Sequence, residues 1–250
     1  MHSSQRRITR PVLGVPTKMG DHCDVTRFRY DQYGGATDPL LMVDHFRMRA
    51  QTFGPHPHNG ISAVTYVFED SRSAHLNHDS LGNDGPIHPG SLHWMVAGSG
   101  VIHDEWPGGE NPESHGLQFF VNLPAEKRDI DAYAVHLESE DVPIYESEGV
   151  RIRVVAGRYG DIQSPILLPQ KFTLLDCFIA SSGAIRIPVG SRGNAWIYSM
   201  RGSVNLIVDQ ESITLDEGYS VAIYSDSLLS INAEDLSQVV VMYGEPVGYS

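Results

Sequence analysis

Two pairs of polar side chains in the first half of the chain have the spacing of metal ligands. His56 and His58 are separated by one residue, and so are His103 and Glu105. Residues i and i+2 of an extended strand point to the same face, so each pair can project two ligand groups into one space. Three imidazoles and one carboxylate suit a divalent transition metal better than magnesium or calcium. The alternative is that these histidines are only solvated or hydrogen-bonded.

The segment between the two pairs has the composition of β-strands that could position them. Residues 63–68 are β-branched and aromatic, residues 80–85 have turn composition, and residues 92–97 are again apolar. Strand, turn and returning strand are typical of an antiparallel barrel, which could bring the two pairs together.

Other histidines in this region are competing ligands: His75, His78, His88, His93 and His115. His75 and His78 have poor strand spacing, so we expect them at the surface or behind the ligands. His93 points opposite to its two neighbours, and one of these two faces must be core. His115 precedes a strand and is the best substitute if one of the main ligands fails.

Further side chains are candidates for the surroundings of a site. Asp44 and His45 end a buried strand, and they could either support metal ligands or form an ordinary strand-end pair. Four large apolar side chains could line a pocket, although barrel core is the stronger reading for each one of them. They are Trp94, Met95, Trp106 and Phe119.

The distribution of residues along the chain predicts two β-barrels of one kind. All twelve histidines lie between His2 and His136, so an imidazole-ligated metal must belong to the N-terminal half. From residue 151 onward, short strands alternate with turns, including an expected hairpin over residues 196–208. Residues 125–149 are acidic, and we expect a solvated connection there. The pattern indicates an internal duplication with the metal kept in one copy.

Composition narrows the possible partners and the compartment. The 250 residues carry a formal net charge of -13, which argues against a non-specific grip on nucleic acid or an anionic membrane. No apolar run is long enough to span a membrane, and no apolar stretch follows the N-terminus as in a secretory signal. Two distant cysteines do not form a disulfide framework, so we expect a reducing cytoplasm.

Several long motifs in order resemble the pirin family of the cupin superfamily. The resemblance extends over roughly residues 8–248 and is dense over residues 38–124. The motifs are His56-Pro57-His58-Asn59-Gly60, the segment from His78 to Asn83, the turn Pro89-Gly90, the segment from Trp94 to Glu105, and the segment from His115 to Pro124.

The resemblance implies an all-β fold of two tandem cupin barrels (double-stranded β-helix or jelly-roll) packed face to face. We expect residues 1–135 to form the metal-binding barrel and residues 136–250 a degenerate barrel without metal. It also implies one mononuclear metal, with Fe(II) expected first and Mn, Ni, Co, Cu or Zn as alternatives. The family's ligand positions match His56, His58, His103 and Glu105 in this sequence.

Family members include enzymes that open the flavonol quercetin with dioxygen, so the resemblance implies a quercetin 2,3-dioxygenase-like oxidoreductase. In that reaction Glu105 would be both ligand and catalytic base. Other members are metal- or redox-dependent regulators that bind a protein partner without turnover, which is the alternative function. We expect a monomer whose partners are a flavonol and dioxygen, or a protein, with no direct nucleic-acid or membrane contact.

The sequence departs from the family pattern around the ligands. Ser62-Ala63 stands where an acidic residue is frequent, Asn59 where arginine is common, and His93 where glutamine is common. The chain also ends soon after Pro246, where a longer tail is usual. None of these departures removes a ligand, but they bear on the polarity of the pocket and on the packing of the barrels.

Overall fold

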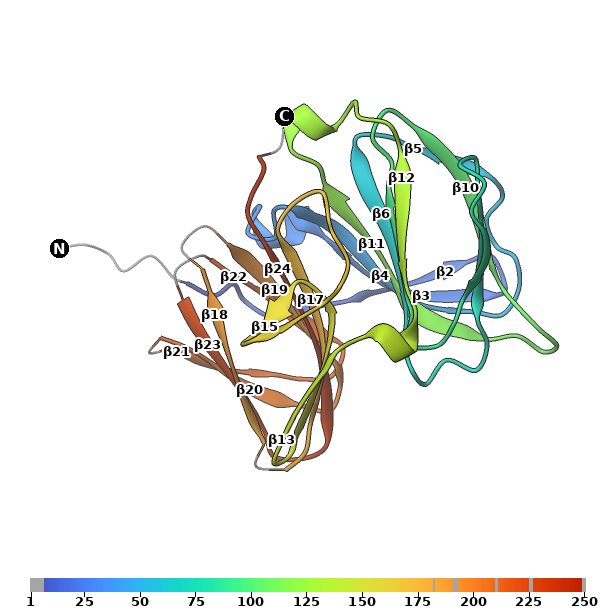
Figure 1. The fold of residues 1–250 in the computed structure, drawn as a ribbon. Helices are drawn as coiled ribbons and strands as arrows, with labels where there is room; N and C mark the ends of the chain where they lie inside the picture. Colours follow the sequence, from blue (N-terminus) through green and yellow to red (C-terminus); the bar gives the residue numbers. More distant parts are fainter. Residues whose placement is uncertain (1–6, 182, 191–192, 210, 225–226, 249–250) are drawn as a thin grey trace.

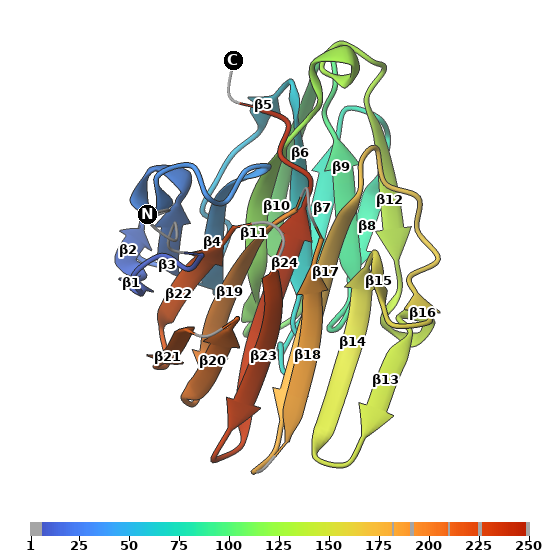
Figure 2. The same ribbon diagram turned by 90° about the vertical axis from the view of Figure 1, so that its left-hand side faces the viewer.

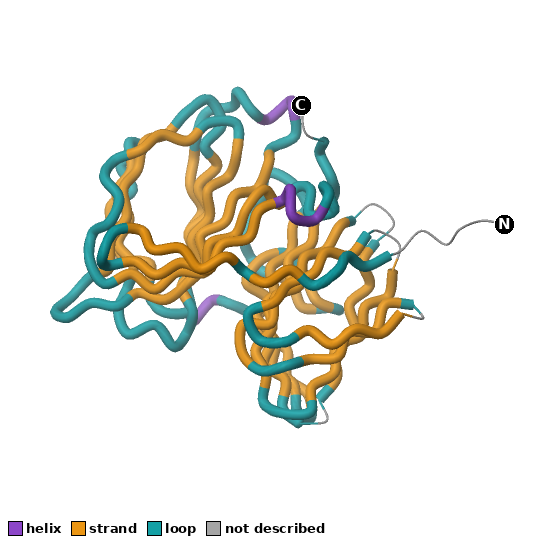
Figure 3. Tube along the Cα trace, turned by 180° about the vertical axis from the view of Figure 1, so that it is seen from behind, coloured by secondary structure: helices purple, strands orange, loops and turns teal. Residues whose placement is uncertain are grey.

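The structure is a computed structural model that describes residues 7–181, 183–190, 193–209, 211–224 and 227–248. Most of these residues lie in β-strands (Figures 1 and 3), which confirms the predicted all-β class. The helical segments are short 3-10 turns: η1 (Tyr30–Tyr33), η2 (Ala125–Lys127) and η3 (Ser139–Asp141). Within the described ranges, no helix is long and apolar enough to cross a membrane.

The N-terminal barrel consists of a seven-stranded and a four-stranded antiparallel sheet. In spatial order the larger sheet contains β12 (Tyr133–Leu137), β9 (Leu92–Val96), β6 (Ile61–Val67), β11 (Ser114–Asn122), β4 (Leu40–Met48), β3 (Cys23–Arg29) and β2 (Val15–Met19). The smaller sheet contains β5 (His56–His58), β10 (Val101–Pro107), β7 (His75–Asp79) and β8 (Asp84–Ile87).

The C-terminal barrel repeats this arrangement, as predicted from the strand pattern (Figure 2). Its larger sheet contains β1 (Val12–Leu13), β22 (Tyr219–Ile223), β19 (Asn194–Arg201), β24 (Ser237–Gly244), β17 (Phe172–Ile179), β14 (Val150–Ala156) and β13 (Ile144–Ser147). Its smaller sheet contains β18 (Ala184–Val189), β23 (Ser227–Ala233), β20 (Val204–Val208) and β21 (Glu211–Leu215). A small ribbon of β15 (Arg158–Tyr159) and β16 (Ile162–Gln163) lies beside them.

The two seven-stranded sheets pack against each other. Side chains alternate along each strand, so one face of the N-terminal sheet meets one face of the C-terminal sheet in a shared apolar core. Trp94 lies at the centre of this core, with its ring 5.9 Å from Phe119 and 5.4 Å from Phe172 of the other barrel. Tyr66 adds a polar link by donating a 2.9 Å hydrogen bond to the buried carboxylate of Asp176. The opposite face of each sheet therefore looks into its own barrel.

Two local expectations are wrong. Residues 125–149 are not merely a solvated connection, because β12 pairs with β9 and β13 pairs with β14. These two strands were not expected from the sequence because the acidic residues between them, in the 3-10 turn η3, make the segment resemble a loop. The segment 196–208 is not a hairpin either: β19 and β20 lie in different sheets, so the turn at Gly202 is a barrel corner.

The division of the chain at residue 135 stays a prediction. Two strand pairings do not respect that division. The early strand β1 pairs with β22 of the C-terminal barrel, and β12 continues the N-terminal sheet to Leu137.

Candidate metal centre

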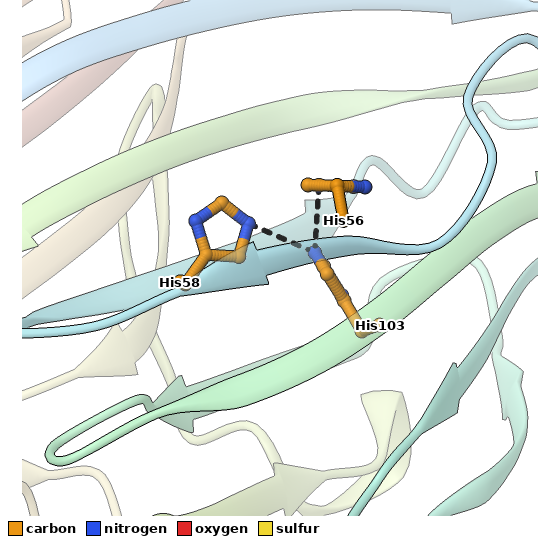
Figure 4. A group of neighbouring side chains, drawn as sticks. All are labelled: His56, His58 and His103. Carbon is orange, nitrogen blue, oxygen red and sulfur yellow. Dashed lines mark hydrogen bonds between the residues drawn. The ribbon is translucent and has the colours of Figure 1, made fainter.

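The four-stranded sheet of the N-terminal barrel brings three histidines together. In the antiparallel pair of β5 and β10, His103 lies opposite His56 and Val101 lies opposite His58. The Nε2 atom of His103 is 3.1 Å from Nε2 of His58 and 3.2 Å from Nε2 of His56 (Figure 4). The ligand atoms of all three side chains lie within 4.8 Å of one another.

Hydrogen bonds on the far side of two rings determine which nitrogen carries the proton. Nδ1 of His56 lies 3.0 Å from the carbonyl oxygen of Gly54, and Nδ1 of His103 lies 3.3 Å from Oδ1 of Asn77. Both oxygens only accept, so each Nδ1 donates and the neutral ring has its lone pair on Nε2. Two lone pairs thus face each other across 3.2 Å with no proton between them.

This arrangement suits a shared cation, and burial disfavours a proton on two of the three rings. Burial, reinforced by the neighbouring imidazoles, lowers the pKa of His58 to about 4. Burial also lowers the pKa of His103, although the nearby Glu105 carboxylate opposes that change. Because these two rings stay neutral at pH 7, they keep lone pairs available. A site rich in histidine, with this proton arrangement, could bind a metal ion.

Glu105 lies two residues after His103 on β10 and faces the same side. Its Oε2 atom is 4.0 Å from Nε2 of His103. Its Oε1 atom accepts a 2.6 Å hydrogen bond from Thr65 and lies 3.6 Å from Nε2 of His75. Burial alone would raise the pKa of Glu105, but the neighbouring His75 and His103 and the hydrogen bond from Thr65 hold it below its ordinary value. The carboxylate is therefore ionised, with Oε2 directed toward the imidazoles.

A cavity of about 540 Å³ adjoins this group. Its wall is mainly apolar and includes Met42, Phe46, Met48 and Phe120. These side chains alternate with interface residues along β4 and β11, and so they point into the barrel. This volume is within the range of sites for small organic ligands.

The four aromatic and sulfur side chains considered for a pocket wall do not line this cavity. Trp94 and Phe119 belong to the core between the barrels, as the alternative reading had it. Met95 packs in a small cluster with Ala63 and Val101, and Trp106 is half-buried elsewhere on β10. Strand alternation turns Trp94, Trp106 and Phe119 away from the cavity, whereas Met95 faces into the barrel and packs against other apolar side chains.

His115 does not reach the metal centre, so the expectation that it could substitute for a ligand is wrong. It lies on the face of β11 that meets the other barrel. Its Nδ1 donates to Asp70 at 2.6 Å, and its Nε2 is 2.7 Å from Nε2 of His45. Nδ1 of His45 accepts from the Tyr198 hydroxyl at 2.8 Å. One proton placement satisfies this whole chain of bonds, in contrast to the cluster of His56, His58 and His103.

The positions of the other candidate residues also depend on which face of its strand each one occupies. His75 is buried and supports Glu105, while the side chains of His78 and His88 are more than half exposed. His93 is buried on the inner face of β9, and its Nε2 has no hydrogen-bond partner among the described residues. Asp44 lies on the cavity wall, where it pairs with Arg27.

Three residues around the site were missed in the sequence: Thr65 and Asn77, which contact Glu105 and His103, and Arg27, which lines the cavity. Thr65 and Ser62 are the polar residues of a mostly apolar strand, and Asn77 lies two residues after His75. Those are weak signals, because neither position reveals which distant strand it will face.

Two tandem barrels with a histidine-rich centre inside the first one define a bicupin with a potential metal site. A family model described as Pirin matches residues 15–121. Human pirin is 30% identical over 247 residues, which cover 98% of this chain and 84% of the human protein. The chain belongs to the pirin family.

Other similar proteins carry the name of an enzyme or a bound metal. A proposed quercetin 2,3-dioxygenase of Pseudomonas aeruginosa is 32% identical over 226 residues, covering 84% of this chain and 76% of that protein. The structure of a quercetin 2,3-dioxygenase from Acinetobacter baumannii has a TM-score of 0.84 at 24% identity, covering 98% and 90% of the two chains. A bacterial pirin from Escherichia coli in complex with nickel(II) has a TM-score of 0.72 at 19% identity, covering 95% and 100%. These two structures show the fold.

Proposed function

We propose that this protein is a metal-dependent dioxygenase that opens a flavonol such as quercetin with dioxygen. In this proposal His56, His58, His103 and Glu105 hold one divalent transition metal, with Fe(II) first and Mn, Ni, Co, Cu or Zn as alternatives. The observation that carries it is the meeting of the imidazole lone pairs of His56 and His103, with no proton between them, beside an apolar cavity. When bound, the metal would supply a Lewis acid for the substrate oxygens and redox chemistry for dioxygen.

The surrounding residues have separate tasks. The Phe and Met side chains of the cavity hold the flavonol rings and exclude water. Thr65 and His75 occupy Oε1 of Glu105 and leave Oε2 as the atom that can receive a proton from the substrate. Because the pKa of Glu105 is held low, it accepts that proton only from a hydroxyl that the site has made more acidic.

A regulator that binds a protein partner according to the state of its metal is the competing function. A cavity of this size with an apolar wall supports the enzyme, because recognition of a protein surface does not need it. The formal net charge of -13 supports the expected absence of direct nucleic-acid contact. A monomer in the cytoplasm remains part of the proposal.

Oxygen uptake with a panel of flavonols tests the proposal, using protein of measured metal content. We expect uptake that requires both metal and flavonol. If fully loaded protein consumes no oxygen with any flavonol, the enzyme proposal fails for this class of substrate. Pull-down under oxidising and reducing conditions would then test the regulator.

A further inference from the structure

An ion pair on the cavity wall has no role in holding the metal centre. Nε of Arg27 donates to Oδ1 of Asp44 at 2.7 Å, and Nη2 donates to Oδ2 at 2.5 Å. The Arg27 side chain is only 21% exposed and that of Asp44 only 11%. A two-pronged pair of this kind holds the guanidinium plane in one orientation.

Arg27 retains donors after this pairing. A guanidinium has five N–H groups, and Asp44 occupies two of them. Among the described residues, Asp44 alone accepts a hydrogen bond from the Arg27 side chain. Both residues line the cavity, so oriented donors are available to a molecule inside it. Because Asp44 cancels the charge, these donors favour a neutral or weakly acidic oxygen over a strongly anionic group.

Strand register connects this pair to the metal centre. Across the large sheet, Arg27 lies opposite Asp44, Asp44 opposite Gln118, and Gln118 opposite Thr65. Thr65 has a single hydroxyl hydrogen, which it donates to ionised Glu105. Oε1 of Gln118 lies 2.7 Å from the same hydroxyl oxygen, so Gln118 also contacts Thr65. This row of paired residues, from Arg27 to Thr65, therefore ends beside the carboxylate of Glu105.

The distance along this row suits a polyphenol. Gln118 and Arg27 are two strands apart, and at the usual spacing their backbones are separated by about 10 Å. The wall nearby carries Met42, Phe46 and Phe120, which give flat apolar rings a surface to stack on. A planar molecule that places its chelating oxygens at the histidines would extend its far ring toward Arg27.

We infer that Arg27, oriented by Asp44, is a specificity-determining residue that donates a hydrogen bond to a phenolic oxygen on the flavonol end remote from the metal. The inference rests on the proposed function and names the substrate feature that the cavity selects. It assigns the pocket to polyhydroxylated flavonols, in preference to those that carry only the chelating hydroxyl and carbonyl.

A comparison of two ligands isolates this contact. Quercetin has ring hydroxyls far from the chelating group, whereas 3-hydroxyflavone keeps that group and lacks them. Affinities are measured by fluorescence quenching on metal-loaded protein without dioxygen, so that binding is separated from turnover. We expect Arg27→Met to weaken quercetin about tenfold to a hundredfold, the loss expected for a charge-assisted hydrogen bond, and to leave 3-hydroxyflavone unchanged.

Two further variants keep the test interpretable. Arg27→Met leaves the Asp44 carboxylate unpaired, so Arg27→Met/Asp44→Asn is measured beside it and should show the same selectivity loss. Arg47→Met is the matched control, because Arg47 lies on the other face of β4 and pairs with Glu113. This control should bind both ligands as the wild type does.

The possible outcomes test the role of Arg27 and the proposed dioxygenase activity separately. Equal weakening of both ligands, or of neither, by Arg27→Met would overturn the role of Arg27 alone. Binding with the expected selectivity but no oxygen uptake in air would support Arg27 and refute the dioxygenase. If the wild type binds neither flavonol, both the proposed substrate and the role of Arg27 fail.

Discussion

Four positions in the four-stranded sheet of the N-terminal barrel correspond to four positions in the four-stranded sheet of the C-terminal barrel, but the side chains there differ in polarity. Strands β10 and β23 each have seven residues, and each pairs with its partner strand in the same register. The positions are polar in the N-terminal barrel and aliphatic in the C-terminal barrel. The corresponding residues are His56 and Ile187, His58 and Val189, His103 and Leu229, and Glu105 and Ile231.

The same barrel architecture therefore has an apolar core at these positions in one copy and a polar group beside a cavity in the other. The aliphatic residues are at most 2% exposed and belong to a continuous apolar core inside the C-terminal barrel. The corresponding polar residues lie at or beside a cavity instead, and within the described ranges the three histidines among them form a group that could hold a metal ion. The barrel that gives up apolar packing at these positions gains a chemical site, and the core shared between the barrels supports its outer face.

The largest expected effect is the loss of metal from one barrel only. Purified protein should carry about one equivalent of a first-row divalent metal, because the part of the chain that the structure describes contains one histidine group of this type. His56→Ala/His103→Ala should abolish binding, as measured by elemental analysis, while the exposed His78→Ala should leave it intact. Full occupancy in the double variant, or metal held by residues 150–250, would break the comparison.

The next effect concerns the position that is Glu105 in one barrel and Ile231 in the other. Glu105→Gln keeps an oxygen that can face the metal but cannot accept a proton. Removal of a positioned base typically costs about a hundredfold to ten-thousandfold in rate, so quercetin turnover should fall by that much. Metal should be partly retained, and substrate affinity should change less. Unchanged turnover at equal metal content would show that Glu105 is not the base.

The sequence was informative about features that depend on the spacing of residues along a single strand. The i, i+2 spacing predicted that His56 with His58, and His103 with Glu105, share a face, and the absence of histidine after His136 placed the histidine cluster in the first barrel. The duplication was also visible, since each half repeats short strands and turns.

What the sequence did not reveal depends on contacts between strands. His115 is on a strand of the N-terminal barrel, but the register of β11 turns its side chain to the other barrel. Arg27 and Asp44 are 17 residues apart, and only the pairing of β3 with β4 makes them neighbours. The strands β12 and β13 were missed because the acidic composition of their surroundings resembles that of a loop.

The smallest expected effect compares the same position in the two barrels without metal. Leu229 is fully buried, so Leu229→Ala should lower the free energy of unfolding by about 2–5 kcal/mol, through lost apolar burial and the cavity left behind. His103→Ala in metal-free protein should cost only about 1 kcal/mol or less, because one hydrogen bond to Asn77 is lost while the facing lone pairs are separated. Urea unfolding of protein treated with a chelator measures both changes. Equal costs would mean that the imidazole in the first barrel is a packing residue like its aliphatic counterpart. The expected inequality would instead mean that its position is maintained for the metal, since the fold gains little from it alone.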